Sequence, residues 1–348
     1  MMIVHFSTVH YRDDSRIRSK MMKSLSARYY GQVKLFVQDG KGNEVDRESN
    51  YLVVDTGPRL PRVKRMLVGG FRMFRAVKLE RPEIAHFHDP ELIPWAILLS
   101  FFGIKVVYDV HEDYPEDVTN NYRLPAFARK LLPPFVRLVE FLGSLYFSGI
   151  VTVTPTIESR FPINKTVLVR NLPVVSEFPS PSKDPMSLRS CEVTYIGTIT
   201  KNRNIIGMLE AIDSIQDAEV TLRLAGDFPV IGDENAARSH PGWSRVHYDG
   251  WVSRHSIANI LASSRAGLVL LKPLEHEAVS FPIKLFEYMA AGLPLISSDF
   301  PVWREIIEDA GCGLLVDPLN TEDIAKAIRW LIDHPDEAQS MGARGRQA

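Results

Sequence analysis

The chain has 348 residues, 45% of them apolar and 24% charged, and its formal net charge is −1. This is the composition of a soluble globular protein, and the length is sufficient for two domains. Two cysteines exclude a disulfide framework. No Cys-x-x-Cys pair or histidine cluster accompanies them, so we expect core thiols, no metal site and a reducing cytoplasm. No secretory signal is recognisable, and the longest apolar run is too short to cross a bilayer.

Strand and helix patterns alternate through the first half of the chain. Short strands rich in Val and Ile, separated by helices, indicate parallel β-α-β units with both faces of the sheet covered. Strands are expected near 1–8, 33–38, 51–57, 84–88, 105–110, 149–154 and 166–170, and helices near 16–30, 61–80, 91–102 and 125–147.

A proline-rich segment, 172–190, interrupts this rhythm and is typical of an interdomain linker. The sequence thus predicts an α/β protein with two Rossmann-like doubly wound domains, 1–171 and 191–335, and a final helix over 336–348. Such domains leave a cleft between them, and ligands bind beyond the carboxyl ends of the strands. In the second domain, strands are expected near 191–197, 220–225, 245–249, 266–272, 293–298 and 313–316, and helices near 204–214, 255–263, 282–291, 301–308 and 320–333.

Polar clusters end two neighbouring strands of the first half. His86, His88 and Asp89 follow one strand, and His111 and Glu112 follow the next. Because the carboxyl ends of parallel strands lie at one edge of the sheet, both clusters are well placed to meet one ligand. His86 is equally compatible with a core histidine, and Asp89 with a cap of the helix that follows.

The loop after the first predicted strand, 9–17, mixes acidic and basic residues. Asp14 is placed to cap the following helix, which would leave Arg16 solvated. A position facing the cleft is compatible with that cap, so both interpretations stay open.

A glycine turn follows the first strand of the second half. Gly197 permits a close approach of the backbone to a ligand, and Lys201 and Arg203 in the same loop would neutralise a diphosphate. Two later strands end in similar turns, at Gly226 and at 250–252. Each turn alone is a weak signal, because a glycine turn after a strand is common. The order of the three turns along the chain, before segment 281–318, is a more specific signal.

The most informative segment is 281–318. Residues 284–291 have a helical pattern, and Gly292 and Pro294 follow as end signals. Glu287 is a carboxylate within this apolar helix, and an ionised carboxylate suits the hydroxyls of a sugar. The helix start would receive a phosphate, for which Lys284 is a candidate partner. The alternative is an ordinary helix with one solvated Glu.

Together these segments resemble the retaining glycosyltransferases of family 4, which have the GT-B fold. The similarity extends over about residues 1–340 and is strongest over 191–318. It implies that His111 and Glu287 are the catalytic residues, with His111 beside the donor sugar and its phosphate and Glu287 holding the ribose. It further assigns the diphosphate to Gly197, Thr198, Lys201, Arg203 and Lys284, the nucleoside to Gly226, Gly250, Trp251, Val252 and Glu287, and the acceptor side of the cleft to Asp14, Arg16, His88, Asp89 and Glu112.

Three features depart from the family pattern. Val279 occupies the position of the first of two Glu residues separated by seven others, with Glu287 as the second. Thr198 occupies the position of a basic residue after the glycine, and the glycine pair expected in the loop after the first strand is missing. The loss of the first Glu fits either a subgroup with a Pro-x-Lys-x-x-Glu segment or a protein that has lost activity.

The resemblance implies a retaining hexosyl- or N-acetylhexosaminyltransferase that uses a UDP- or GDP-sugar. Its acceptor would be a glycan or a lipid-linked glycan in cell-surface polysaccharide assembly. The sequence has no Asp-x-Asp pair, so we expect transfer without a metal or cofactor, with basic side chains and helix N-termini stabilising the leaving diphosphate. Two alternatives stay open: a non-hydrolysing nucleotide-sugar epimerase, and a catalytically silent subunit that binds a nucleotide-sugar.

Charge is unevenly distributed along the chain. Residues 1–165 contain 24 Lys and Arg against 18 Asp and Glu, and the remainder contains 17 against 24. Two stretches, 59–78 and 124–147, interleave basic with large apolar residues, as helices on an anionic leaflet do. The alternative is ordinary helices that pack on the sheet. We expect peripheral contact with the inner face of the plasma membrane, and no nucleic-acid partner because no such motif is present.

Overall fold

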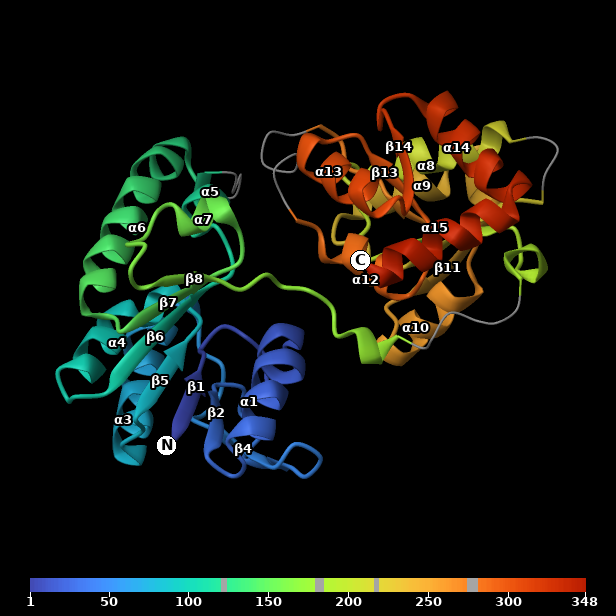
Figure 1. The fold of residues 1–348 in the computed structure, drawn as a ribbon. Coiled ribbons are helices and arrows are strands. Elements are labelled where there is room, and N and C mark those ends of the chain that lie inside the picture. Colours follow the sequence, from blue (N-terminus) through green and yellow to red (C-terminus); the bar gives the residue numbers. More distant parts are fainter. Residues whose placement is uncertain (120–123, 179–184, 216–218, 274–280) are drawn as a thin grey trace. The chain divides into compact units, whose positions relative to one another are not determined.

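The computed structural model describes residues 1–348 apart from 120–123, 179–184, 216–218 and 274–280 (Figure 1). It divides into two compact units, Met1–Asn171 and Leu172–Ala348. Each unit is an α/β sandwich around a mainly parallel sheet, as the sequence predicts.

The first unit has an eight-stranded sheet of order β3-β4-β2-β1-β5-β6-β7-β8. All neighbours are parallel except β3, which pairs antiparallel with β4. The sequence did not indicate β3, because a strand of three residues has no clear alternation. The strands are β1 (Ile3–Phe6), β2 (Val33–Val37), β3 (Glu44–Asp46), β4 (Tyr51–Asp55), β5 (Ile84–Phe87), β6 (Lys105–Val110), β7 (Gly149–Thr152) and β8 (Thr166–Leu168).

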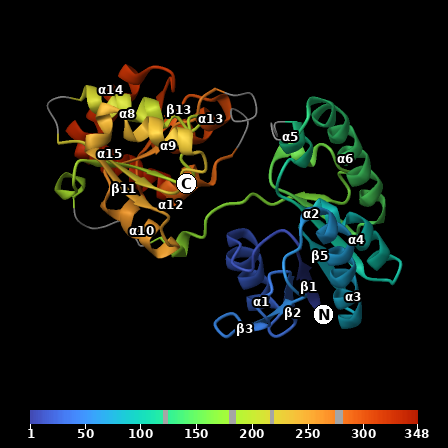
Figure 2. The same ribbon diagram turned by 180° about the vertical axis from the view of Figure 1, so that it is seen from behind.

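Helices cover both faces of this sheet (Figures 1 and 2). Successive side chains of a strand point to opposite faces. Phe36 of β2 accordingly joins the core beneath α3 and α4, whereas Leu35 joins the core beneath η1. The helices are η1 (Ser15–Met22), α1 (Lys23–Arg28), α2 (Arg62–Lys64), η2 (Arg65–Gly69), α3 (Gly70–Glu80), η3 (Pro90–Leu92), α4 (Ile93–Ser100), α5 (Tyr114–Thr119), α6 (Ala126–Tyr146) and α7 (Pro155–Glu158).

The second unit has a fully parallel six-stranded sheet of order β11-β10-β9-β12-β13-β14. One core lies beneath α8 and α14 and the other beneath α12 and α13. The strands are β9 (Glu192–Ile196), β10 (Thr221–Ala225), β11 (Val246–Gly250), β12 (Ala266–Val269), β13 (Leu295–Ser298) and β14 (Gly313–Val316). The helices are η4 (Val175–Glu177), η5 (Met186–Leu188), α8 (Ile205–Ser214), α9 (Ile231–Arg238), η6 (Pro241–Arg245), α10 (Arg254–Ser263), α12 (Ile283–Ala290), α13 (Pro301–Ala310), α14 (Thr321–Asp333) and α15 (Pro335–Gln347).

The described part of 172–190 belongs to the second unit. Phe178 and Met186 are buried in its two cores, and the Met186 amide donates to Gln339 Oε1 of α15 at 3.1 Å. The α15 helix itself lies against the turn after α12. A Cβ added to Gly342 would lie 2.1 Å from the Gly292 carbonyl oxygen, so only glycine allows this approach.

Candidate active site

Three glycine turns meet at the carboxyl edge of the second sheet. The amide of Gly197 donates to the Ala225 carbonyl at 2.8 Å, and that of Gly226 donates to the Gly250 carbonyl at 2.7 Å. Both Gly197 (φ 120°) and Gly226 (φ 147°) have backbone conformations that L-residues rarely adopt. A Cβ on Gly226 would lie only 2.1 Å from the Gly197 carbonyl oxygen. The turns therefore pack backbone against backbone, and the three half-buried glycines place no side chain between this backbone and a ligand.

We call the three turns at Gly197, Gly226 and Gly250 the glycine edge. The α12 helix begins beside it. The Tyr288 hydroxyl accepts a hydrogen bond from the Ile196 amide at 2.9 Å, which fixes the helix against the end of β9. One turn earlier, Lys284 Nζ lies 3.8 Å from the Tyr195 ring centroid and 3.3 Å from where a Cβ of Gly197 would stand. A helix N-terminus and an ammonium group next to a backbone turn without side chains suit an anion such as a diphosphate.

Glu287 is buried on the same helix, with 8% of its surface exposed. Its Oε1 accepts a hydrogen bond from Arg254 Nη1 at 2.6 Å, and Arg254 Nη2 binds Glu177 Oε2 at 2.7 Å. Burial opposes the charge of Arg254, but the hydrogen bonds with both carboxylates raise its pKa. Sequence reasoning missed Arg254 and Glu177, because their spacing along the chain gives no hint of contact.

The remaining predicted donor residues lie around the glycine edge with differing exposure. Thr198 is exposed, and its carbonyl accepts from the Tyr195 hydroxyl at 2.8 Å. Lys201 Nζ lies 3.8 Å from Asp233 of α9. The α9 helix was not predicted, because its apolar pattern is weak. Trp251 is 75% exposed, which leaves its ring available to a flat ligand. Arg203 and Val252 are half-buried, and Val279 lies outside the described residues.

A buried carboxylate, Asp109, organises the carboxyl edge of the first sheet. Arg16 binds both of its oxygens, at 3.0 and 2.7 Å, and His88 Nδ1 lies 3.0 Å from Oδ2. His111 Nδ1 lies 3.3 Å from the same oxygen. Burial alone would raise the pKa of Asp109, but hydrogen bonds with these three side chains hold it well below its usual range. The structure thus joins three of the predicted residues, and Arg16 is buried rather than solvated.

A second chain of contacts extends from His111 towards the loop after β1. Its Nε2 lies 3.1 Å from His10 Nε2, and His10 Nδ1 lies 3.2 Å from Asp14 Oδ2. Burial lowers the pKa of His10, but Asp14 and Asp89 outweigh this and raise it. Despite burial, the hydrogen bond from His10 helps to lower the pKa of Asp14 to about 2. Asp14 also caps η1 through the amides of Arg16 and Ile17, so the cap and the polar cluster coexist.

Asp89 does not cap the helix that follows it. Its Oδ2 instead accepts hydrogen bonds from the Ser7 hydroxyl at 2.9 Å and the Thr8 amide at 2.6 Å, which fixes the loop after β1. Burial raises the pKa of Asp89. Glu112, in contrast, is exposed.

Three histidines gather around Asp109: His5 and His88 are buried and His86 is half-buried. His5, which sequence reasoning missed, places Nδ1 at 3.1 Å from His88 Nε2. Burial lowers the pKa of both His86 and His88 to about 3, so they are neutral at pH 7. Among the described residues, ligand atoms of His86, His88 and Asp109 lie within 4.8 Å of one another. The guanidinium of Arg16 already binds both oxygens of Asp109, so this arrangement suits a hydrogen-bonded network better than a cation.

The two doubly wound units have the architecture of the GT-B fold. Residues 8–161 match the family model Glycosyltransferase Family 4, and residues 186–348 match the model Glycosyl transferases group 1. The chain therefore belongs to glycosyltransferase family 4.

The chain is similar to a curated relative and to solved structures. It is 32% identical over 146 residues to D-rhamnosyltransferase WbpZ of Pseudomonas aeruginosa, a match that covers 40% of this chain and 38% of that protein. The chain thus matches about two-fifths of that relative's length. Sucrose-phosphate synthase from Thermosynechococcus elongatus has a TM-score of 0.76 at 16% identity, covering 99% of this chain and 93% of that one. Anabaena Alr3699/HepE in complex with UDP-glucose has a TM-score of 0.72 at 11% identity, covering 100% and 94%. These likenesses show the fold.

Proposed function

We propose that this protein transfers a sugar from a nucleotide-sugar to a glycan or lipid-linked acceptor in polysaccharide assembly, with retention of configuration. The observation that carries the proposal is the glycine edge, where Gly226 leaves no room for a side chain and Lys284 lies beside Gly197. Backbone groups, a helix N-terminus and one ammonium group together form a cradle for a diphosphate. The neighbour solved with UDP-glucose makes a UDP-sugar the first donor to test, before a GDP-sugar.

The diphosphate would bind between Gly197 and the start of α12, with Lys284 as its closest cation. Lys201 and Arg203 would add positive charge from the β9–α8 loop, in place of the basic residue that Thr198 replaces. The nucleoside would bind along Gly226 and 250–252. The ribose would use the oxygen of Glu287 that Arg254 does not bind.

We propose that the leaving diphosphate takes the proton of the acceptor hydroxyl on the face where the new bond forms. Lys284 and the N-terminus of α12 would stabilise the charge that develops on the leaving oxygen, so no metal ion is required. Retention through a covalent intermediate would need a carboxylate nucleophile near the sugar. Glu287 is unsuited to that role because Arg254 binds it. His111 would hydrogen-bond the transferred sugar.

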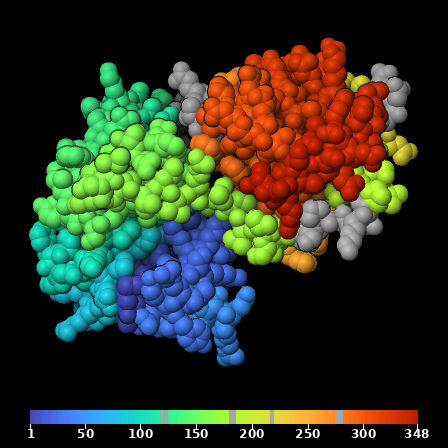
Figure 3. Space-filling model, in the orientation of Figure 1, coloured from blue at the N-terminus to red at the C-terminus, as the bar shows by residue number. Residues whose placement is uncertain are grey.

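We also propose that the first unit rests on an anionic membrane through α6. Many large apolar side chains of α6 are exposed, among them Phe127 at 69% and Leu131 at 65%, and basic residues such as Lys130 lie between them. The green atoms of this helix lie at the surface of the first unit (Figure 3). Within the described residues, no helix has both the length and the apolarity to cross a bilayer. Peripheral binding at the cytoplasmic face would bring the enzyme to a lipid-linked acceptor.

A catalytically silent nucleotide-sugar-binding subunit is the second candidate. One observation favours it: Arg254 forms ion pairs with both Glu287 and Glu177, so the carboxylate assigned to the ribose already has a partner. If this network does not open for the ribose, the protein would bind a nucleotide weakly and turn over no donor.

Calorimetric titration with UDP, GDP and ADP tests the proposal. We expect micromolar binding of one nucleotide, weakened about tenfold or more in Lys284→Ala, because a charge-assisted hydrogen bond contributes roughly 1.5–3 kcal/mol. Lys326→Ala is the matched control, since Lys326 is exposed on α14 and pairs with Glu322. Turnover of the matching donor with acceptor then separates a transferase from a silent subunit. Failure of all three nucleotides to bind would overturn the donor site.

A further inference from the structure

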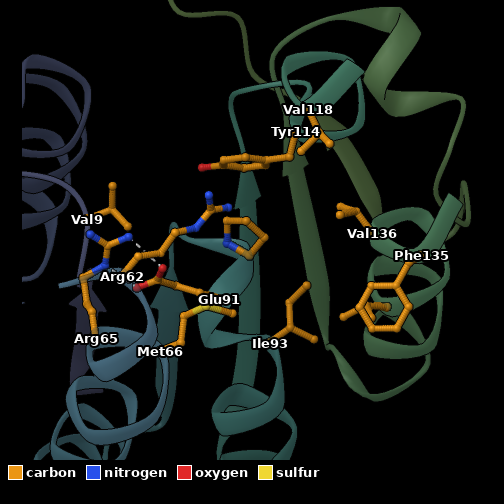
Figure 4. A pocket seen from close by; sticks show the side chains of 12 residues that line it. Val9, Arg62, Arg65, Met66, Glu91, Ile93, Tyr114, Val118, Phe135 and Val136 are labelled. Carbon is orange, nitrogen blue, oxygen red and sulfur yellow. Dashed lines mark hydrogen bonds and ion pairs between the residues drawn. The ribbon is translucent and has the colours of Figure 1, made fainter. Parts of the chain in front are cut away.

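A largely apolar pocket lies in the first unit (Figure 4). Its volume is about 290 Å³, close to the lower end of ligand-binding pockets at roughly 300 Å³. Met66 of η2, Ile93 of α4, Val118 of α5 and Phe135 of α6 form much of its wall. The pocket is thus built from four helices that the sheet holds in place.

Charged side chains gather at one side of the pocket. Arg65 binds both oxygens of Glu91, at 2.7 and 2.9 Å, so its charge is compensated. Arg62 also lines the pocket, and in the described parts of the chain no carboxylate pairs with it. An apolar interior with one uncompensated guanidinium at its edge is complementary to an aliphatic chain that carries a phosphate.

We propose that this pocket binds the aliphatic chain of an anionic lipid, with the lipid phosphate on Arg62. Given the proposed transferase function, on which this step rests, that lipid carries the acceptor. The ligand class is therefore a lipid phosphate rather than a free oligosaccharide.

The polar side of the pocket is linked to His10 and Asp89 through the loop after β1. Val9 lines the pocket and is the chain neighbour of His10. The Thr8 hydroxyl donates to Glu91 at 2.7 Å, while the Thr8 amide donates to Asp89 at 2.6 Å. A head group on Arg62 would therefore lie towards the cluster that includes His10 and Asp89.

The apolar side of the pocket reaches the exposed face of α6. Phe135 both lines the pocket and is 60% exposed, so one side chain borders the interior and the surface. A lipid chain longer than the pocket would continue along the exposed apolar residues of α6, where the proposed membrane contact lies. The pocket would thus hold the part of the chain next to the phosphate, and the surface of α6 would hold its far end.

Calorimetric titration with octyl, decyl and dodecyl phosphate, each below its micelle concentration, tests this inference. We expect affinity to rise roughly fourfold for each methylene that the pocket buries. Val136→Trp fills the pocket from α6 and should remove this dependence on chain length. Leu138→Trp is the matched control, because Leu138 is 52% exposed on the same helix and does not line the pocket. Arg62→Ala should weaken decyl phosphate about tenfold.

Val118→Trp fills the pocket from α5, so the test does not depend on one variant folding; thermal melting by circular dichroism verifies each fold. Inorganic phosphate binding as tightly as dodecyl phosphate would reveal a phosphate site only and overturn the proposal. An equal loss in Leu138→Trp would reveal adsorption to the exposed face and overturn it as well. Nucleotide titration of the same variants separates the two proposals, because a failed donor site leaves alkyl phosphate binding unchanged.

Discussion

The two units present polar groups at the carboxyl edges of their sheets in different ways. In the first unit, the buried side chain of Asp109 holds Arg16 and His88 through side-chain hydrogen bonds. In the second unit, Gly197 and Gly226 pack backbone against backbone, so closely that Gly226 has no room for a side chain. The first edge is thus a preformed network of charges, whereas the second is a preformed shape. Substitutions that remove a charge should consequently disrupt the edge of the first sheet, and substitutions that add volume should disrupt the edge of the second.

The largest effect on stability is expected from Asp109→Asn. The substitution leaves Arg16 as a buried guanidinium without its carboxylate, and breaking a buried ion pair costs about 3–5 kcal/mol. Urea unfolding at pH 7 measures the loss. Because the folded pKa of Asp109 is depressed, its stabilisation is present above the unfolded pKa and is lost as pH falls through the folded pKa. The difference between wild type and variant should therefore shrink in acid.

Asp13→Asn is the matched control for this prediction. Asp13 also pairs with an arginine, Arg18, at 2.8 Å, but its side chain is 66% exposed. Exposed pairs contribute roughly 0–1 kcal/mol. Equal destabilisation by the two variants would contradict the view that the first edge depends on a buried charge. Nucleotide binding, assigned to the second unit, should survive in both.

Gly226→Ala should have the next largest effect, on nucleotide binding. The added Cβ would overlap the Gly197 carbonyl at a φ of 147°, so the turn must move. Overpacking and backbone strain each cost about 1–3 kcal/mol, so we expect nucleotide affinity to fall roughly 30-fold or more. Calorimetry measures this, and Gly232→Ala is the control because nothing lies within 4 Å of its added Cβ. Unchanged affinity in Gly226→Ala would place the nucleotide elsewhere.

Much of the fold could be predicted because its strands and most helices have clear hydrophobic periods. The short elements β3, α5 and α7 were missed, since three to six residues carry too little of a period, and α9 was missed because its apolar pattern is weak. Motif residues such as His111 and Glu287 could be singled out from local pattern. Arg254, the partner of Glu287, and His5, the partner of His88, could not, because 33 residues separate Arg254 from Glu287 and 83 separate His5 from His88. Contacts over such distances follow from tertiary packing, which one sequence does not reveal.

The smallest effect is expected on membrane binding. Here an exposed apolar residue of the first unit is compared with one of the second. Leu131→Glu on α6 removes one apolar contact and adds a charge that anionic lipids repel, so vesicle binding should fall about tenfold. Ile231→Glu on α9 is the control, because Ile231 is 69% exposed but belongs to the second unit. Sedimentation with anionic and zwitterionic vesicles measures both variants. If Ile231→Glu weakened binding as much as Leu131→Glu, the membrane contact would not belong to α6, and the lipid pocket beside that helix would lose its route of entry.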